Sequence, residues 1–207
     1  MHCKGIMVDM SDTAKKFFEE HKLELGEVGE IITVFNRIEN IVVMLISNAF
    51  ASVYGQERII LINDTLNDGN IFETFEQKIN FLEKVISRVA MIATKRSESF
   101  DEKKYLAVCK SIRNIQKYRN KIAHISLAFS PEGKAVIFKR KKDKELLTTK
   151  NGSFNKEELD LKDIKEKIWA VYQEAENVLI KEGSTQMLNI LLKEEFQNLN
   201  RIKKSKT

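Results

Sequence analysis

The chain has 207 residues, of which 43% are hydrophobic and 31% are charged. This composition is that of a globular protein with enough chain to bury a core, and it excludes a disordered or fibrous one. Basic residues exceed acidic ones, 35 against 30, so the net charge is +5 and the isoelectric point is about 9.0. That excess fits a polyanionic partner, and it equally fits lysines that only solvate helix surfaces.

Several protein classes are disfavoured by the sequence. Cys3 and Cys109 are far apart and suggest no disulfide framework, so we expect a reduced, cytoplasmic setting. Lys4 and Asp9 interrupt the apolar run that a signal peptide would need. The longest apolar run, residues 41–46, falls short of the roughly 20 residues that span a bilayer, so we expect no membrane partner. No Cys/His cluster has zinc-ligand spacing and no glycine-rich phosphate loop is present, so we expect no metal and no cofactor.

Few residues interrupt helices, because Pro131 is the only proline and the glycines number eight. The sequence therefore predicts a mainly α protein. We expect a single domain over residues 1–207, with a core at about 30–182, a C-terminal helix at 184–202 and a basic tail at 203–207.

The first predicted elements are a short helix ending near His21, a break at the glycines of residues 26–29, and a long helix over 30–54. Val43 and Met44 widen the apolar face of the long helix. We therefore expect this helix to be covered on more than one side, by a second subunit or by the rest of a bundle.

A turn at 67–70 precedes a predicted helix that runs from Phe75 to about Thr94, and polar residues 95–99 end it. Another helix is expected over 100–124. Its buried stripe is predicted to consist of Val108, Ile112, Ile115, Tyr118, Ile122 and Ile125.

A small β-hairpin is predicted next, with strands at 125–129 and 135–139 around the turn at 130–133. A second turn is expected at 151–152. Asp160 begins an amphipathic helix whose apolar stripe reaches Leu179, and Ser184 is expected to cap a separate last helix.

Residues 119–124, Arg-Asn-Lys-Ile-Ala-His, carry the most informative chemistry. On an ideal helix His124 and Asn120 share the outer side, and Arg119 lies at the margin of the buried stripe, where its guanidinium can reach outward. A histidine can move the proton of a ribose 2′-hydroxyl, an arginine can stabilise phosphate charge in the transition state, and an asparagine can orient either group. None of these steps needs a metal ion. Two copies about a twofold axis would supply both an acid and a base.

The same residues have a structural interpretation. A histidine in the last turn of a helix also stabilises the helix dipole, by about 0.3–1 kcal/mol. An arginine five residues before a histidine also arises by chance, so the spacing alone leaves both interpretations open.

The segment at 119–124 resembles the signature of HEPN domains, in which an arginine, often followed by asparagine, precedes a histidine by four to six residues. Residues 35–40, 75–82 and 112–118 are similar to the helices that flank this signature, so the resemblance covers about 30–124.

The resemblance implies a HEPN-like bundle of four or five helices, with the small β-hairpin inserted after the motif helix. It also implies a homodimer whose paired motifs cleave RNA without a metal, as toxins, phage-defence proteins or RNA-processing enzymes do. His124 would be the general acid or base, Arg119 would stabilise the phosphorane, and Asn120 would position the substrate or His124. Glu39 would face the same cleft, or else be solvated or form a salt bridge.

Basic residues near the motif are candidates for RNA-backbone contacts, namely Lys121, Lys139, Arg140, Lys141 and Lys142. The run 139–142 would equally protect an exposed edge strand from aggregation.

The leading expectation is a ribonuclease that acts as a toxin or against phage, and a toxin would have an antitoxin as a further partner. Two alternatives to this function stay open. One is a non-catalytic HEPN-type dimer that binds RNA or a protein. The other is a structural helical subunit in which Asn120 and His124 are buried and hydrogen-bonded.

Overall fold

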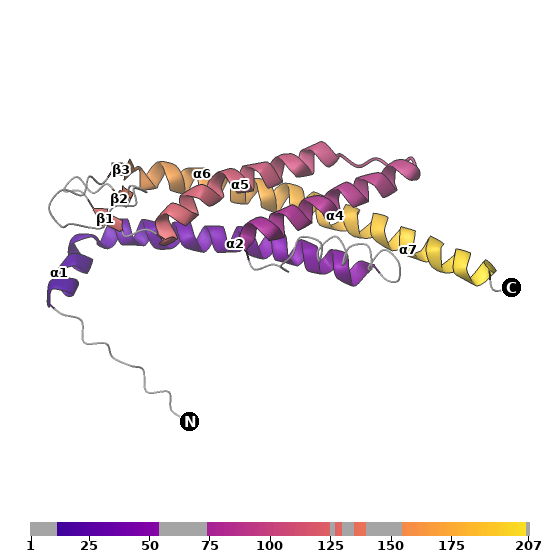
Figure 1. Ribbon diagram of the computed structural model, residues 1–207, viewed down its shortest axis with the longest axis horizontal. Coiled ribbons are helices and arrows are strands. Elements are labelled where there is room, and N and C mark those ends of the chain that lie inside the picture. Colours follow the sequence, from indigo (N-terminus) through magenta and orange to yellow (C-terminus); the bar gives the residue numbers. More distant parts are fainter. Residues whose placement is uncertain (1–11, 54–73, 125–126, 130–134, 140–154, 206–207) are drawn as a thin grey trace, which may run out of the picture.

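The computed structural model describes residues 12–53, 74–124, 127–129, 135–139 and 155–205 (Figure 1). This part of the chain is mainly helical, which confirms the predicted fold class at that level. The expected turns at 67–70, 130–133 and 151–152, the basic residues 140–142 and the end of the basic tail lie outside the described residues.

The described part of the chain forms helices and three short strands. In chain order they are α1 (Asp12–Glu20), α2 (Lys22–Ser52), α4 (Phe75–Lys95), α5 (Glu102–His124), β1 (Leu127–Phe129), β2 (Ala135–Lys139), β3 (Asn155–Leu159), α6 (Leu161–Ala175), the π-helical segment η1 (Glu176–Ser184) and α7 (Thr185–Ser205).

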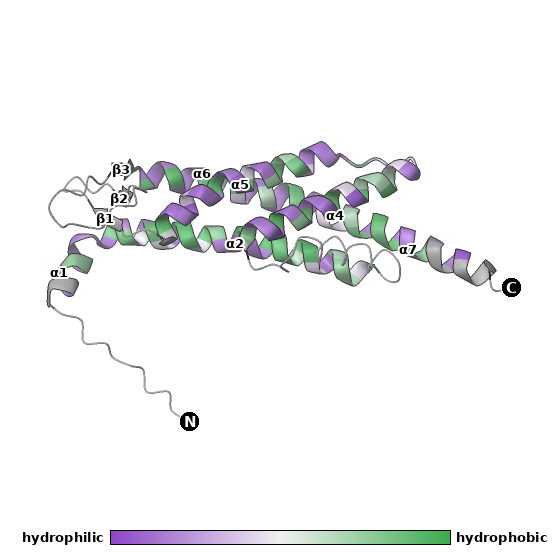
Figure 2. Ribbon diagram, in the orientation of Figure 1, coloured by the Kyte–Doolittle hydropathy of each residue, from purple (hydrophilic) through white to green (hydrophobic). Residues whose placement is uncertain are grey.

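The long helices lie lengthwise in an elongated bundle (Figure 1). α2, α4, α6 and α7 point toward one end, and α5 returns to the end at which α2 and α6 begin and the strands lie. One apolar core joins these helices, with Phe35 from α2, Phe81 from α4, Ile112 from α5, Ile168 from α6 and Ile190 from α7 all buried. In Figure 2 the green, hydrophobic turns of each helix alternate with purple, hydrophilic ones, as the amphipathic spacing predicts.

α2 begins at Lys22, so the predicted break at residues 26–29 is wrong. Gly26 and Gly29 lie on an open side of the helix, where an added Cβ would meet no atom within 4 Å. Contacts with α6 hold this turn in place: Lys165 Nζ lies 3.4 Å from Glu27 Oε1, and Trp169 Nε1 donates to Glu30 Oε1 over 2.8 Å. Tertiary packing thus overrides the glycines, each of which costs a helix about 1 kcal/mol.

α4 matches its predicted bounds closely because local signals mark both of its ends. Thr74 and Gln77 form a reciprocal capping box at the start. At the other end the amides of Ser97 and Glu98 donate to the carbonyls of Thr94 and Ala93. This is a Schellman motif with Ser97, at φ 57°, in the left-handed position that glycine usually takes.

α7 begins at Thr185, close to the predicted start, but α6, η1 and α7 follow one another without a break, so the last helix is not separate. The Ser184 hydroxyl does not cap a following turn, because it donates to the Ile180 carbonyl at 2.6 Å. Gly183 is buried under α5, and a Cβ there would lie 2.6 Å from Tyr105 Cε1. The absence of a side chain at this position lets the π-helical turn approach α5.

β1 and β2 pair antiparallel, with Leu127 opposite Ile137, and β2 pairs antiparallel with β3. The third strand was not predicted, since its sequence Asn-Lys-Glu-Glu-Leu has little intrinsic preference for β structure. Pairing with β2 supplies its backbone hydrogen bonds.

Candidate functional site at the C-terminal end of helix α5

α5 carries residues 119–124 in its last turns and ends at His124. Four of the six residues predicted for its buried stripe, Val108, Ile112, Ile115 and Ile122, are at most 4% exposed, while Tyr118 is half-buried. Ile125 lies outside the described residues. The apolar stripe therefore fixes how the motif is rotated about the helix axis.

Arg119 lies against α2. Its guanidinium carbon is 5.9 Å from the centroid of the Phe35 ring, a cation–π distance. Phe35 is buried and makes an edge-to-face contact with Phe75 of α4, with ring centroids 4.9 Å apart. The side chain of Arg119 is half-buried, so it reaches outward less than the sequence predicts.

Asn120 follows on the exposed surface, where its Oδ1 accepts from Arg119 Nη1 at 3.4 Å. The alternative of a purely structural subunit predicts that Asn120 is buried. The exposed position of Asn120 does not agree with that alternative. Lys121 is half-buried. His124 is the last residue of α5, and its side chain is outside the described part of the structure. Five residues of ideal helix separate it from Arg119 by about 140° of rotation and about 7.5 Å of rise.

Arg113 is also followed by an asparagine, but its guanidinium is already engaged. Nε donates to Glu76 Oε1 at 2.8 Å, and Nη2 donates to Asn80 Oδ1 at 2.5 Å and to Glu83 Oε2 at 2.7 Å. All three acceptors lie on one face of α4. The hydrogen bonds with Glu83, followed by those with Glu76, raise the pKa of Arg113. Arg113 therefore fastens α5 to α4.

Glu39 lies on α2, one helical turn beyond Phe35, and forms an ion pair with Lys78 of α4. Both side chains are only about a fifth to a quarter exposed. The salt-bridging role that the sequence left open is the one observed. The contact of Phe35 with Arg119 and the ion pair of Lys78 with Glu39 were not predicted, because the linear sequence gives no signal for contacts between different helices.

The second group of predicted RNA contacts is only partly described. Lys139 is the last residue of β2, and nothing is described of its side chain. Arg140, Lys141 and Lys142 lie outside the described residues.

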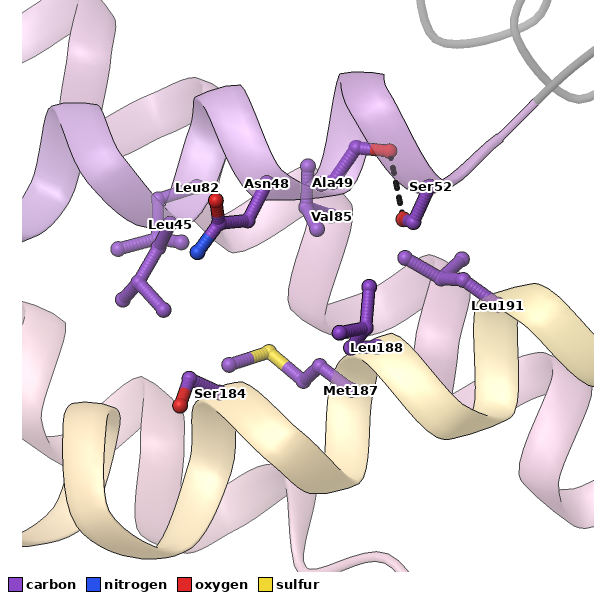
Figure 3. A pocket seen from close by; sticks show the side chains of 10 residues that line it. All are labelled: Leu45, Asn48, Ala49, Ser52, Leu82, Val85, Ser184, Met187, Leu188 and Leu191. Carbon is purple, nitrogen blue, oxygen red and sulfur yellow. Dashed lines mark hydrogen bonds between the residues drawn. The ribbon is translucent and has the colours of Figure 1, made fainter.

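A small pocket of about 10 Å³, room for about one water molecule, opens between α2, α4 and the η1–α7 junction (Figure 3). Its walls are mostly apolar, and at its edge the Ser52 hydroxyl donates to the Ala49 carbonyl at 2.9 Å. The pocket lies along the C-terminal half of α2, whereas Arg119 contacts Phe35 in the first half. The motif is therefore a surface site outside this pocket.

Within the described residues, no group of three or more His, Cys, Asp or Glu side chains is placed to hold a metal ion. There, too, no helix combines the length and the apolar character needed to cross a membrane.

Comparisons with protein-family models, with curated proteins and with solved structures found no match to this chain. The HEPN assignment accordingly stays a sequence-based prediction, carried by residues 119–124 and the three segments that flank them.

Proposed function

We propose that the chain is a metal-independent endoribonuclease of the HEPN type, acting as a toxin or in phage defence. The observation that carries this proposal is the end of α5, where Arg119 is braced over the Phe35 ring, Asn120 is exposed beside it, and His124 ends the helix. A guanidinium held by a ring loses little freedom when it contacts a phosphate, which favours charge stabilisation in the transition state.

In the proposed reaction one His124 imidazole removes the proton of the ribose 2′-hydroxyl. The 2′-oxygen then attacks the adjacent phosphorus and displaces the 5′-oxygen of the next nucleotide, which takes a proton from a second, protonated imidazole. The products are a 2′,3′-cyclic phosphate and a free 5′-hydroxyl. Because one chain offers a single histidine at this place, the second His124 comes from another copy in a homodimer.

The test is incubation of the full chain with RNA in the presence of EDTA. We expect cleavage to persist and to produce 2′,3′-cyclic phosphate ends. His124→Ala and Arg119→Ala should each lower the rate by about 10²–10³-fold. Arg201→Ala, at an exposed arginine of α7, is the matched control and should cleave like the wild type. Full activity in both motif variants would remove these residues from the mechanism.

The same experiment separates the proposal from its alternative, a non-catalytic dimer that binds RNA or a protein. That alternative predicts RNA binding without turnover, and His124→Ala binding with unchanged affinity. Sedimentation measurements add the oligomeric state, because a monomer at all concentrations would contradict the paired-histidine mechanism. If the chain is a toxin, the proposal includes an antitoxin partner. Such a partner is expected to bind at residues 119–124 and to stop RNA cleavage.

A further inference from the structure

The exposed side of α5 is unusually rich in positive charge. The helix carries seven lysines and arginines but only one acidic residue, Glu102. Four of the lysines recur at spacings that keep them on one side of the helix, namely Lys103, Lys110, Lys117 and Lys121. With Ala107 and Asn114 between them they alternate by four and three residues, the spacing of a single helical face. We call these four lysines the lysine track.

Among the described residues, Lys103, Lys110 and Lys117 have no acidic partner. Lys103 and Lys110 are exposed and, within the described part of the chain, form no hydrogen bond or ion pair. The Lys117 ammonium lies 5.2 Å from the centroid of the neighbouring Tyr118 ring. Several other described lysines are paired with glutamates, among them Lys78, Lys104, Lys165 and Lys193, so the lysine track differs in gathering three lysines without an acidic partner on one helix face. A helix face that is merely solvated usually mixes the two signs of charge, and this one does not.

The lysine track also leads to the candidate site. Eighteen residues separate Lys103 from Lys121, which corresponds to about 27 Å along the helix axis. The same alternation continues by three residues to position 124, where α5 ends. Purple, hydrophilic turns recur along α5 as far as that end (Figure 2). A chain of phosphates lying on this face would therefore arrive at position 124, whereas Arg119 lies on the opposite face of the helix, against Phe35.

We propose that the lysine track binds the phosphate backbone of single-stranded RNA and guides it to the C-terminal end of α5. The inference deepens the proposed function and rests on it for the identity of the nucleic acid. An acidic protein partner fits less well, because stable protein interfaces need an apolar anchor. The large exposed apolar side chains of the described residues lie on α1, α2, α4 and α7, and none lies on α5.

The test is the salt dependence of RNA affinity. A fluorescent oligo-uridine is titrated with the full chain carrying His124→Ala, in EDTA and at several salt concentrations. Lys110→Gln combined with Lys117→Gln should weaken binding and flatten the slope of log affinity against log salt by about 1.4, about 0.7 for each lost phosphate contact. The matched control combines Lys22→Gln with Lys95→Gln, two exposed lysines on α2 and α4 with the same change in net charge. It should leave the slope unchanged.

The outcomes separate this inference from the proposed function. Equal slopes in the two double variants, or no RNA binding by the parent chain, overturn the lysine track. Displacement of the RNA by poly-glutamate at equal charge, with poly-glutamate binding weakened in the lysine-track variant and unchanged in the control, assigns the face to an acidic protein and also overturns the proposal. A flattened slope in a chain that never cleaves RNA keeps the lysine track and removes the ribonuclease. Thermal unfolding of each variant confirms that the fold is intact.

Discussion

The guanidinium carbon of Arg119 lies 5.9 Å from the centroid of the Phe35 ring, and this contact ties the end of α5 to the first half of α2. Phe35 in turn packs edge-to-face on Phe75, the first residue of α4. Three helices thus meet beneath one arginine, and the position of this arginine depends on the packing of all three.

Replacement of the ring tests that dependence. Phe35→Leu keeps an apolar side chain but removes the cation–π contact, so we expect RNA cleavage to fall roughly tenfold. Phe81→Leu is the control, because Phe81 is equally buried and stacks on Phe50 with ring centroids 5.2 Å apart. Both variants should unfold at lower urea concentrations, and only Phe35→Leu should lose activity. Equal activities in the two would show that the ring does not position Arg119.

Two helical glycines are expected to respond in opposite directions to alanine. Gly29→Ala adds a methyl group into open space, so the free energy of unfolding should rise by about 0.5–1 kcal/mol. Gly183→Ala places a Cβ 2.6 Å from Tyr105 Cε1 and 2.9 Å from the Val178 carbonyl, so stability should fall by about 1–3 kcal/mol. Urea unfolding of both variants measures the difference. A stabilising alanine at Gly183 would contradict the close approach of η1 to α5.

The half-buried charge network of Arg113 should contribute more to the free energy of unfolding than an exposed ion pair does. Arg113→Met leaves Glu76 and Glu83 without their shared partner, and we expect a loss of about 2 kcal/mol. Lys104→Met breaks the exposed pair with Glu182 and should cost clearly less, because water and salt screen exposed charges. Denaturant unfolding at low and moderate salt compares the two variants. Similar losses in the two variants would mean that the network adds nothing beyond an ordinary surface pair.

The buried thiol of Cys109 predicts a loss of stability at alkaline pH. Burial raises its pKa from an ordinary value of 9.0 to about 12, so between these values the folded chain keeps a proton that the unfolded chain has lost. The unfolded state then binds fewer protons, and stability falls as the pH rises from about 9 to about 12, by up to about 1.4 kcal/mol per unit.

The measurement compares urea unfolding at several alkaline pH values in Cys109→Ala and in the parent chain, both carrying Cys3→Ser. The alanine variant should show a shallower decline. Parallel declines would indicate that other groups, such as Tyr105, whose pKa is also raised by burial, account for the whole effect.

Some features of the fold and the candidate site follow from short stretches of sequence. The capping box at Thr74 and the polar residues after Lys95 mark both ends of α4, because each signal acts within about one helical turn. The 3.6-residue period likewise places Ile112, Ile115 and Ile122 in the core, and with them the rotation of residues 119–124 about the axis of α5.

Other features were decided only by the tertiary structure, because they depend on residues far apart in the chain. α2 continues through Gly26 and Gly29 since Lys165 and Trp169, more than 130 residues away, hold the carboxylates of its first turns. Packing between separate helices also places Phe35 beneath Arg119 and lets Lys78 form an ion pair with Glu39. Local periodicity shows which side of a helix faces inward, and only the assembled bundle determines which side chains that side meets.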